Sequence, residues 1–273
     1  MQRTSPLVSI AVPTYKQAQY LPACLDALWF QDYPNIEIVV VNAASPDNTR
    51  EVLDRYEREV AEDEVSYARY FNEETDEVER QYHPRYPKAG RTLKVIHLEQ
   101  DPGLSETYNL GVRESQGKFV TTIVSDDIPH PKLISRLMQA LEEKQADFAY
   151  ADAWLVEDSG RIVRQFDYPD YDPRTCLADW YLMGSAKLWR RELHERAGWF
   201  STDYPLTQDY ELFFRFAEAG ARIVHVPEVL YSIRWHGPAR KTGNHSPERE
   251  PRIFSESKET AKRARAWLAS RAE

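Results

Sequence analysis

The chain has 273 residues with 42% hydrophobic and 29% charged side chains, which suits one large α/β domain or two modest ones. Its formal net charge of −9 argues against nucleic acid as the main partner, because such binding depends on neutralising phosphates with Lys and Arg. The two cysteines, Cys24 and Cys176, lack the paired spacing of a disulfide framework or a thiolate zinc site, and this fits a reducing cytosol.

The first half of the sequence alternates short apolar strands with amphipathic helices. Strands are expected at residues 7–12, 36–41, 93–98 and 119–124. The helix after the first strand carries Pro22 in its first turn and shows the spacing of a face packed on a sheet, with apolar side chains at Leu21, Cys24, Leu25, Leu28 and Trp29. This alternation predicts a mostly parallel sheet with right-handed crossovers.

Residues 51–91 break the alternation, with twelve acidic and seven basic side chains. We interpret this stretch as an exposed helical excursion that ends in a Pro-rich return loop. Two interpretations stay open for it, a solvated charged face and a docking segment for a partner.

The second half continues with a helix from Pro131, a strand at 148–156 and a turn at 159–161 into a further strand. A helix at 209–220 and two strands flanking Pro227 follow, and a last helix is expected at 257–270. These elements are expected to extend the same sheet rather than to form an independent domain. No GxGxxG, GxxxxGK[ST] or GxSxG motif occurs, which argues against Rossmann dinucleotide binding, P-loop phosphate transfer and a serine elbow.

Two adjacent carboxylates, Asp126 and Asp127, directly follow a buried strand. Crowded like charges are unfavourable unless a cation relieves them, and Mg²⁺ or Mn²⁺ completed by substrate phosphates is the obvious candidate. The alternative is that the pair only caps the helix that starts at Pro131.

Two further features carry chemistry. Asp209 lies in the first turn of an amphipathic helix, where it is either a general base or a residue that stabilises the helix dipole. The loop at 231–245 contains Arg234, His236, Arg240 and Lys241, which either close over a diphosphate or form an ordinary basic surface.

Taken in order, these segments resemble the family 2 glycosyltransferases, which have the GT-A fold. The stretch VSIAVPTYKQAQYLPACLDALWFQDYPNIEIVVVNAASPDNT is similar to the opening segment of the family, and DPGLSETYNLGVRESQGKFVTTIVSDDIPHPKLI to its central segment. GSAKLWRRELHERAGWFSTDYPLTQDYELFFRFAEAG resembles the acceptor-side segment, which ends in a Glu-Asp pair. The resemblance covers most of residues 7–236 and implies one α/β domain with a smaller acceptor-side extension and a C-terminal helical tail.

The resemblance implies roles for individual residues. Asp209 is expected to be the base that deprotonates the acceptor hydroxyl. A divalent ion, Mn²⁺ or Mg²⁺, is expected on the donor diphosphate at Asp126, Asp127 and His236. Contacts to the nucleotide are expected from Pro13, Thr14, Tyr15, Asn42, Asn109, Ser125 and Asp126, and contacts to the diphosphate or its loop from Arg234, Arg240 and Lys241.

The implied reaction is an inverting, single-displacement transfer from a nucleotide-diphosphate sugar to a hydroxyl of a glycan, polysaccharide or lipid-linked saccharide. A glycosidase would instead need two carboxylates that flank the bond. The rival hypotheses are a catalytically impaired domain of this type that acts as a binding or scaffold module, and a nucleotidyltransferase. The second rival is disfavoured because the Gly-rich N-terminal loop of such enzymes is missing.

The sequence departs from the family pattern at four places. Gln208–Asp209 replaces the Glu-Asp pair, Val124 replaces the first Asp of Asp-x-Asp, and Thr107–Tyr108–Asn109 replaces Ala-Arg-Asn. In the turn after the second strand, where the family usually has an aspartate that reads the base, this chain has Asn42 and Ala43. We therefore expect weaker discrimination for uracil.

The expected organisation is a nucleotide-sugar-binding half at 1–128, an acceptor-binding half of the same domain at 129–236, and a flexible loop with a C-terminal helix at 237–273. No signal-like segment and no apolar run near ~18 residues occurs, so we expect a cytoplasmic protein. The last helix is expected either to reach an anionic inner membrane face or to pack back on the domain, with basic residues Lys262, Arg263, Arg265 and Arg271 around Ala264, Trp267 and Leu268.

Overall fold

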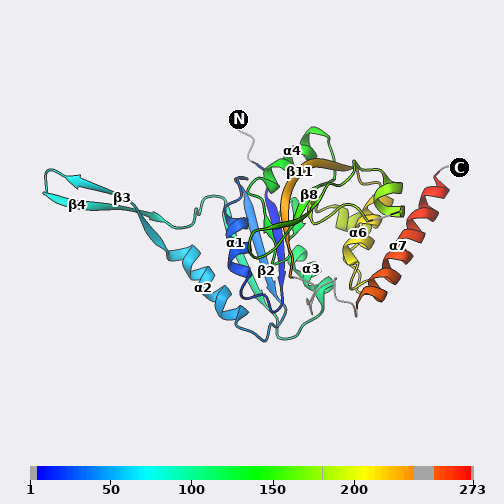
Figure 1. Ribbon diagram of the computed structural model, residues 1–273, viewed down its shortest axis with the longest axis horizontal. Helices are drawn as coiled ribbons and strands as arrows, with labels where there is room; N and C mark the ends of the chain where they lie inside the picture. Colours follow the sequence, from blue (N-terminus) through cyan, green and yellow to red (C-terminus); the bar gives the residue numbers. More distant parts are fainter. Residues whose placement is uncertain (1–4, 180, 237–248, 272–273) are drawn as a thin grey trace.

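The computed structural model describes residues 5–179, 181–236 and 249–271. A nine-stranded sheet in the order β5-β2-β1-β6-β10-β8-β11-β7, with β9 paired to β8, runs through the domain (Figure 1). Its parallel half consists of β1 (Val8–Thr14), β2 (Ile36–Asn42), β5 (Arg91–His97) and β6 (Phe119–Thr122). These four strands are the ones expected from the apolar runs of the first half.

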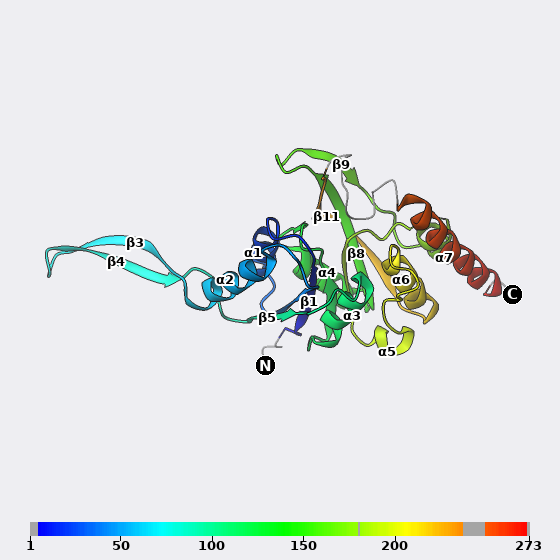
Figure 2. The ribbon, with the colours of Figure 1, turned by 90° about the horizontal axis from the view of Figure 1, so that it is seen from below.

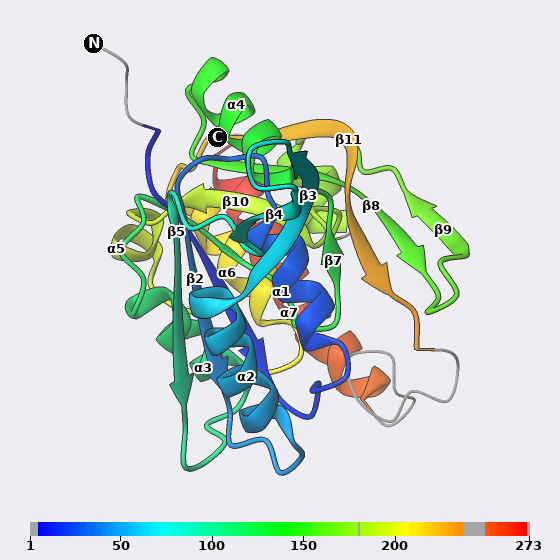
Figure 3. The same ribbon diagram turned by 90° about the vertical axis from the view of Figure 1, so that its left-hand side faces the viewer.

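The second half adds strands of both directions to the same sheet. Antiparallel pairing joins β10 to β6 and β8, β7 to β11, and β9 to β8, whereas β11 is parallel to β8. These strands are β7 (Ile128–Pro129), β8 (Phe148–Val156), β9 (Ile162–Phe166), β10 (Ala186–Arg190) and β11 (Ile223–Arg234). The sheet is therefore continuous and mixed; in Figure 3, β2 and β5 lie on the left of the view and β8, β9 and β11 on the right.

Helices cover both faces of the sheet. The strands β1 and β2 are therefore buried along their whole length. One face carries α1 (Leu21–Trp29), α2 (Thr49–Glu62) and α4 (Leu133–Glu143). The other carries α3 (Leu104–Arg113), η1 (Arg174–Asp179), α5 (Leu193–Ala197), α6 (Gln208–Glu218) and α7 (Glu250–Ser270).

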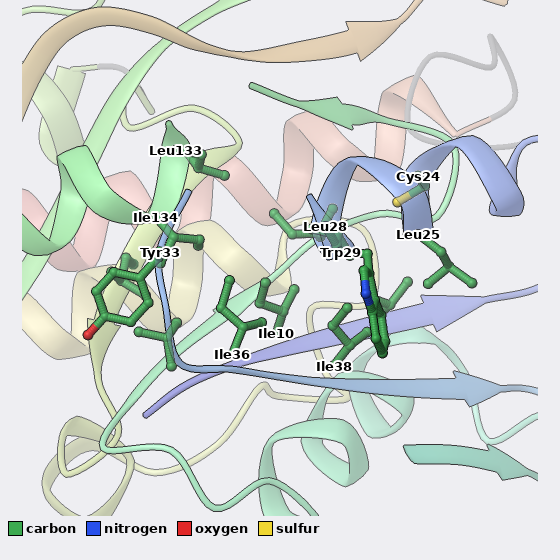
Figure 4. Close-up of a cluster of buried hydrophobic side chains, with 14 of the residues drawn as sticks. Ile10, Cys24, Leu25, Leu28, Trp29, Tyr33, Ile36, Ile38, Leu133 and Ile134 are labelled. Carbon is green, nitrogen blue, oxygen red and sulfur yellow. The ribbon is translucent and has the colours of Figure 1, made fainter. Parts of the chain in front are cut away.

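The core on the α1 face follows the predicted apolar stripe. In Figure 4 the side chains of α1 face those of the two central strands, with labelled members Cys24, Leu25, Leu28, Trp29, Ile10, Ile36 and Ile38. On the opposite face α3 approaches β1 closely: a Cβ added at Gly111 would lie 2.9 Å from the Cβ of Ala11. Glycine at this position lets α3 lie close against β1.

The expected helical excursion at residues 51–91 is wrong beyond Glu62. After α2 the chain forms a separate antiparallel ribbon of β3 (Glu64–Asn72) and β4 (Glu77–Pro84), which projects away from the domain (Figures 1 and 2). Aromatic and β-branched residues such as Tyr70, Phe71 and Val78 are interspersed with charged ones here, and this composition favours a strand. Counting only the charges concealed these strand-forming residues.

One other expectation changed in detail. The strands expected on either side of Pro227 form one strand, β11, whose register with β8 shifts between Val226 and Val229 and again before Tyr231. A proline cannot donate to the ladder, so it is tolerated at such an irregularity.

The last helix packs back on the domain, which was one of the two expected outcomes. Ala264 is buried, the Trp267 ring meets Phe214 edge-on at 6.0 Å between centroids, and Arg263 pairs with Glu211 at 2.9 Å. None of the helices in the described ranges combines the length and the apolar content that crossing a bilayer requires.

Candidate active site

Three parallel strands end in one polar row at the carboxyl edge of the sheet. Thr14 of β1 is in register with Asn42 of β2, and Asn42 is in register with His97 of β5. Open α/β sheets bind ligands outside the carboxyl ends of their strands. The row therefore marks the part of the edge where the resemblance places the nucleotide.

Both polar atoms of the Asn42 side chain already have hydrogen-bond partners within the protein. Its Nδ2 lies 3.1 Å from Nδ1 of His97, and its Oδ1 accepts the backbone N–H of Ser45 at 3.1 Å. Thr14 differs, because its Oγ1 is buried and has no hydrogen-bond partner among the described residues. Tyr15, next to it, is 42% exposed, so Thr14 and Tyr15 offer the groups that a ligand could still engage.

The two central carboxylates lie in the turn after β6 and diverge. Oδ2 of Asp126 is 2.7 Å from Nε2 of His236 and 3.5 Å from Nε2 of Gln17. Oδ1 of Asp127 instead accepts the backbone N–H of Arg234 at 2.9 Å. Both residues are almost fully buried, and the turn is held between the loop that precedes α1 and the end of β11.

Arg234 also contacts the turn that contains Asp126 and Asp127, through its side chain. Its Nε donates to the backbone carbonyl of Asp126 at 2.7 Å, its guanidinium lies 4.5 Å from the ring centre of Tyr20, and it pairs with Asp158. Arg234 was expected to contact the diphosphate. In this structure its guanidinium contacts protein groups instead. Arg240 and Lys241 lie outside the described residues.

Asp126 and His236 fit a divalent ion, whereas Asp127 fits it less well. Nε2 of His236 and Oδ2 of Asp126 share a hydrogen bond of 2.7 Å, so an ion held by both would replace the proton between them; atoms ~2.1 Å from one octahedral ion are ~3 Å apart, a small change from this distance. Within the described ranges no three His, Cys, Asp or Glu side chains converge as a metal site would require. An ion here would need substrate phosphates and water to complete its shell.

Asp209 lies in the first turn of α6, where three groups of the protein contact its carboxylate. Its Oδ2 accepts the hydroxyl of Tyr181 at 3.1 Å and lies 3.4 Å from Nζ of Lys187 on β10. Its Oδ1 accepts the N–H of Tyr210 at 2.9 Å. Burial raises the pKa of the Tyr181 hydroxyl well above its usual value, and the Asp209 charge raises it further, so Tyr181 remains a donor.

One cleft of about 220 Å³ joins the two carboxylates after β6 to Asp209 and Lys187. It is lined by Asp126, Asp127, Lys187, Gln208 and Asp209, together with Leu104, Tyr108, Thr122, Val124, Ser185, Phe200, Tyr231 and Ile233. The structure thus brings the three carboxylates singled out in the sequence into one space. Lys187 and Tyr181 were not predicted, although a lone lysine within the apolar strand Ala186–Arg190 was a visible signal.

The remaining expected nucleotide contacts fall into two kinds. Asn109 is saturated by the chain, because its Nδ2 donates to the carbonyl of Phe200 and to Glu106, and its Oδ1 accepts the N–H of Phe200. It holds the Phe200 loop on α3 and has little left for a ligand. Ser125, by contrast, has a buried Oγ without a partner among the described residues, as Thr14 does.

The chain matches one known family over nearly its whole length. Residues 5–270 match the family described as "Glycosyltransferase like family 2". The glycosyltransferase GlyG of Streptococcus pneumoniae serotype 4 is 26% identical over 155 residues, which cover 57% of this chain and 42% of that protein. The chain therefore spans less than half the length of this relative.

Two solved structures share the fold. Staphylococcus aureus TarS 1-349 in complex with UDP-GlcNAc gives a TM-score of 0.64 at 20% identity, covering 88% of this chain and 60% of that one. The mannosyltransferase PcManGT from Pyrobaculum calidifontis, in complex with GDP-Man and Mn²⁺, gives 0.58 at 21% identity and covers 98% and 76%. With this arrangement of strands and the family match over residues 5–270, the chain belongs to the glycosyltransferase-like family 2 and has a fold of the GT-A type.

Proposed function

We propose that the protein transfers a sugar from a nucleotide-diphosphate sugar to an acceptor hydroxyl by a single inverting displacement. The observation that carries this proposal is the shared cleft, in which Asp126 and Asp127 line one part and Asp209 another. The family match and the nucleotide sugars in the TarS and PcManGT complexes support the donor class.

Asp209 acts as the general base in this proposal. The O–H bond of the acceptor breaks, its proton passes to the Asp209 carboxylate, and its electron pair forms the bond to the anomeric carbon. The bond from that carbon to the diphosphate breaks, and its electron pair leaves on the phosphate oxygen. One base and one displacement imply inversion at the anomeric carbon.

Asp126 and His236 would hold a divalent ion, Mn²⁺ or Mg²⁺, which would take the place of the proton in the hydrogen bond that now joins them. When bound, such an ion offsets the negative charge of the leaving diphosphate. The Mn²⁺ in the PcManGT complex supports this choice. The acceptor is proposed to be a saccharide, free, polymeric or lipid-linked. The exposed Lys262 and Arg265 of α7 are the groups that would touch an anionic membrane.

A panel of nucleotide sugars, each with and without Mn²⁺, tests the proposal through release of the nucleoside diphosphate. We expect at least one donor to be turned over in the presence of Mn²⁺ and of a mixed saccharide acceptor pool. Asp209→Asn should keep the rise in Tm that the matching nucleoside diphosphate produces and should lose turnover by ~10²–10⁴-fold.

The outcomes separate the candidate functions. No turnover, together with no change in Tm by UDP, GDP, CDP or dTDP in the presence of Mn²⁺, would reject the enzyme and favour the binding-module alternative. Full turnover by Asp209→Asn would reject Asp209 as the base and leave the transferase activity itself standing.

A further inference from the structure

Lys187 is a buried charge on the face of β10 that points into an apolar cluster. It alternates with Ala186 and Leu188, which belong to the core on the opposite face of the sheet, and shares its own face with Trp189. Its side chain is 7% exposed, and its Nζ lies 4.6 Å from the ring centre of Phe213. A lysine is almost never buried in this way unless it is paired.

The partner of this charge is Asp209. Nζ of Lys187 is 3.4 Å from Oδ2. Burial lowers the pKa of Lys187, and the charge and hydrogen bond of Asp209 partly offset this lowering. Both residues line the cleft, but the Asp209 side chain is 33% exposed and that of Lys187 7%, so the carboxylate is the more accessible group. This geometry places a fixed cation on the protein side of the proposed base.

The donors around Asp209 are distributed unevenly between its two oxygens. An ionised carboxylate offers about four lone-pair positions, two on each oxygen. Oδ2 receives Tyr181 and Lys187, whereas Oδ1 receives the N–H of Tyr210. Among these contacts, Oδ1 is the oxygen that keeps a position for a substrate.

We propose that Lys187 is a positioning residue that, with Tyr181, holds Oδ2 of Asp209 on the protein side, so that Oδ1 takes the proton of the acceptor hydroxyl. This inference rests on the proposed function and deepens it. Lys187 does not touch the reacting atoms; it acts by fixing the orientation and the ionised form of the carboxylate that does.

The charge of Lys187 gives this role a pH signature. Burial lowers the pKa of Lys187, so the cation is lost at a lower pH than for a free lysine. The other titratable groups that line the cleft are Asp126 and Asp127 after β6, Tyr108 on α3 and Tyr231 on β11, and Tyr181 faces Asp209 directly. Activity should therefore fall on the alkaline side as Lys187 becomes neutral.

The experiment measures nucleotide release from the donor identified in the panel, over a pH series, for the wild type, Lys187→Arg and Lys187→Met. We expect Lys187→Met to lower kcat by ~10²-fold with little change in the KM for the donor. Lys187→Arg should recover at least ~10-fold of that loss, and its alkaline limb should move to higher pH because arginine stays charged. Lys94→Met, which removes an exposed lysine paired with Glu114, is the matched control and should behave as the wild type.

A double-mutant cycle separates positioning from packing. If Lys187 acts through Asp209, then Lys187→Met should have no further effect on kcat in the Asp209→Asn background. Methionine fills the space beside Phe213, and Asp209 keeps Tyr181, so Lys187→Met should fold; its Tm is measured in the same series.

Wild-type kcat and an unchanged alkaline limb in both Lys187 variants would overturn the inference while leaving the transferase proposal intact. An equal loss in the Asp209→Asn background would also overturn it, because Lys187 would then act independently of Asp209. If the wild type itself turns over no donor, the proposed function fails first, so the two failures are distinguishable.

Discussion

Asn42 and His97 are paired in register on the parallel strands β2 and β5, and Nδ2 of Asn42 lies 3.1 Å from Nδ1 of His97. Because Nδ2 can only donate, Nδ1 accepts, and the neutral ring carries its proton on Nε2, 3.5 Å from Asp54. With Oδ1 taken by Ser45, the side chain of Asn42 mainly holds the turn in shape. The turn offers a base no carboxylate, and weaker uracil discrimination remains our expectation.

Asn42→Ala is expected to lower stability more than it changes base preference. It removes two hydrogen bonds at a residue that is 2% exposed, which costs about 2 kcal/mol and roughly 4–8 °C in Tm. Asn48→Ala is the control, because Asn48 is exposed and starts α2 without a side-chain cap bond. Thermal melts with UDP and GDP check both variants. An unchanged Tm with an altered order of nucleotide preference would contradict this account and make Asn42 a base reader.

The divalent ion is expected to depend more on Asp126 than on Asp127. Asp126→Asn weakens a ligand next to His236, so the rise in Tm that Mn²⁺ adds to a nucleoside diphosphate should disappear. Asp127→Asn keeps an oxygen for the N–H of Arg234, and should retain at least half of that rise. A Mn²⁺ titration followed by thermal melts measures this, with the exposed Asp32→Asn as control. Equal losses in the two central variants would restore Asp127 as a ligand.

The sequence predicted the four parallel strands of the first half and singled out the three carboxylates of the cleft because these depend on local patterns: an apolar run, acids directly after it, or an acid in the first turn of a helix. Sequence-based prediction failed for residues whose interaction partners lie far away in the chain. Asn109 sits in a motif expected to contact nucleotide, yet its amide is satisfied by Phe200, ninety-one positions further on. Lys187 is one charge in a short strand, and only the fold shows that its face of the sheet meets Asp209.

The β3–β4 ribbon is expected to be dispensable for folding and for nucleotide binding. It forms a sheet of its own, and Glu64 pairs with Pro84 at its base, so the chain can be closed there. Replacing residues 65–83 with an Asn-Gly turn should change Tm by less than ~3 °C, since no core side chain is removed. It also removes five exposed large hydrophobic residues and should improve solubility; they are Val65, Tyr70, Phe71, Val78 and Tyr82. Loss of the nucleotide-dependent rise in Tm would show that the ribbon supports the donor site.

The pH dependence of stability is expected to include a contribution from His194. This side chain is 3% exposed; its Nε2 accepts the indole N–H of Trp189 at 3.1 Å, and its Nδ1 donates to the carbonyl of Gly198 at 3.0 Å. Both ring nitrogens are used by the neutral form. Burial lowers the pKa of His194 from 6.5 to about 4, and nearby arginines add to this.

Because the folded pKa lies below the unfolded one, the contribution of His194 is fully present above pH 6.5 and is lost as the pH falls toward 4. At ~1.4 kcal/mol per pH unit, the loss amounts to about 3 kcal/mol over that window. His194→Gln cannot gain a proton, so its free energy of unfolding should start lower at pH 7 and fall less by pH 4.5. Denaturant unfolding at a series of pH values measures this, and the exposed His83→Gln should follow the wild type. Parallel curves for the wild type and His194→Gln would mean that other groups carry the acid sensitivity.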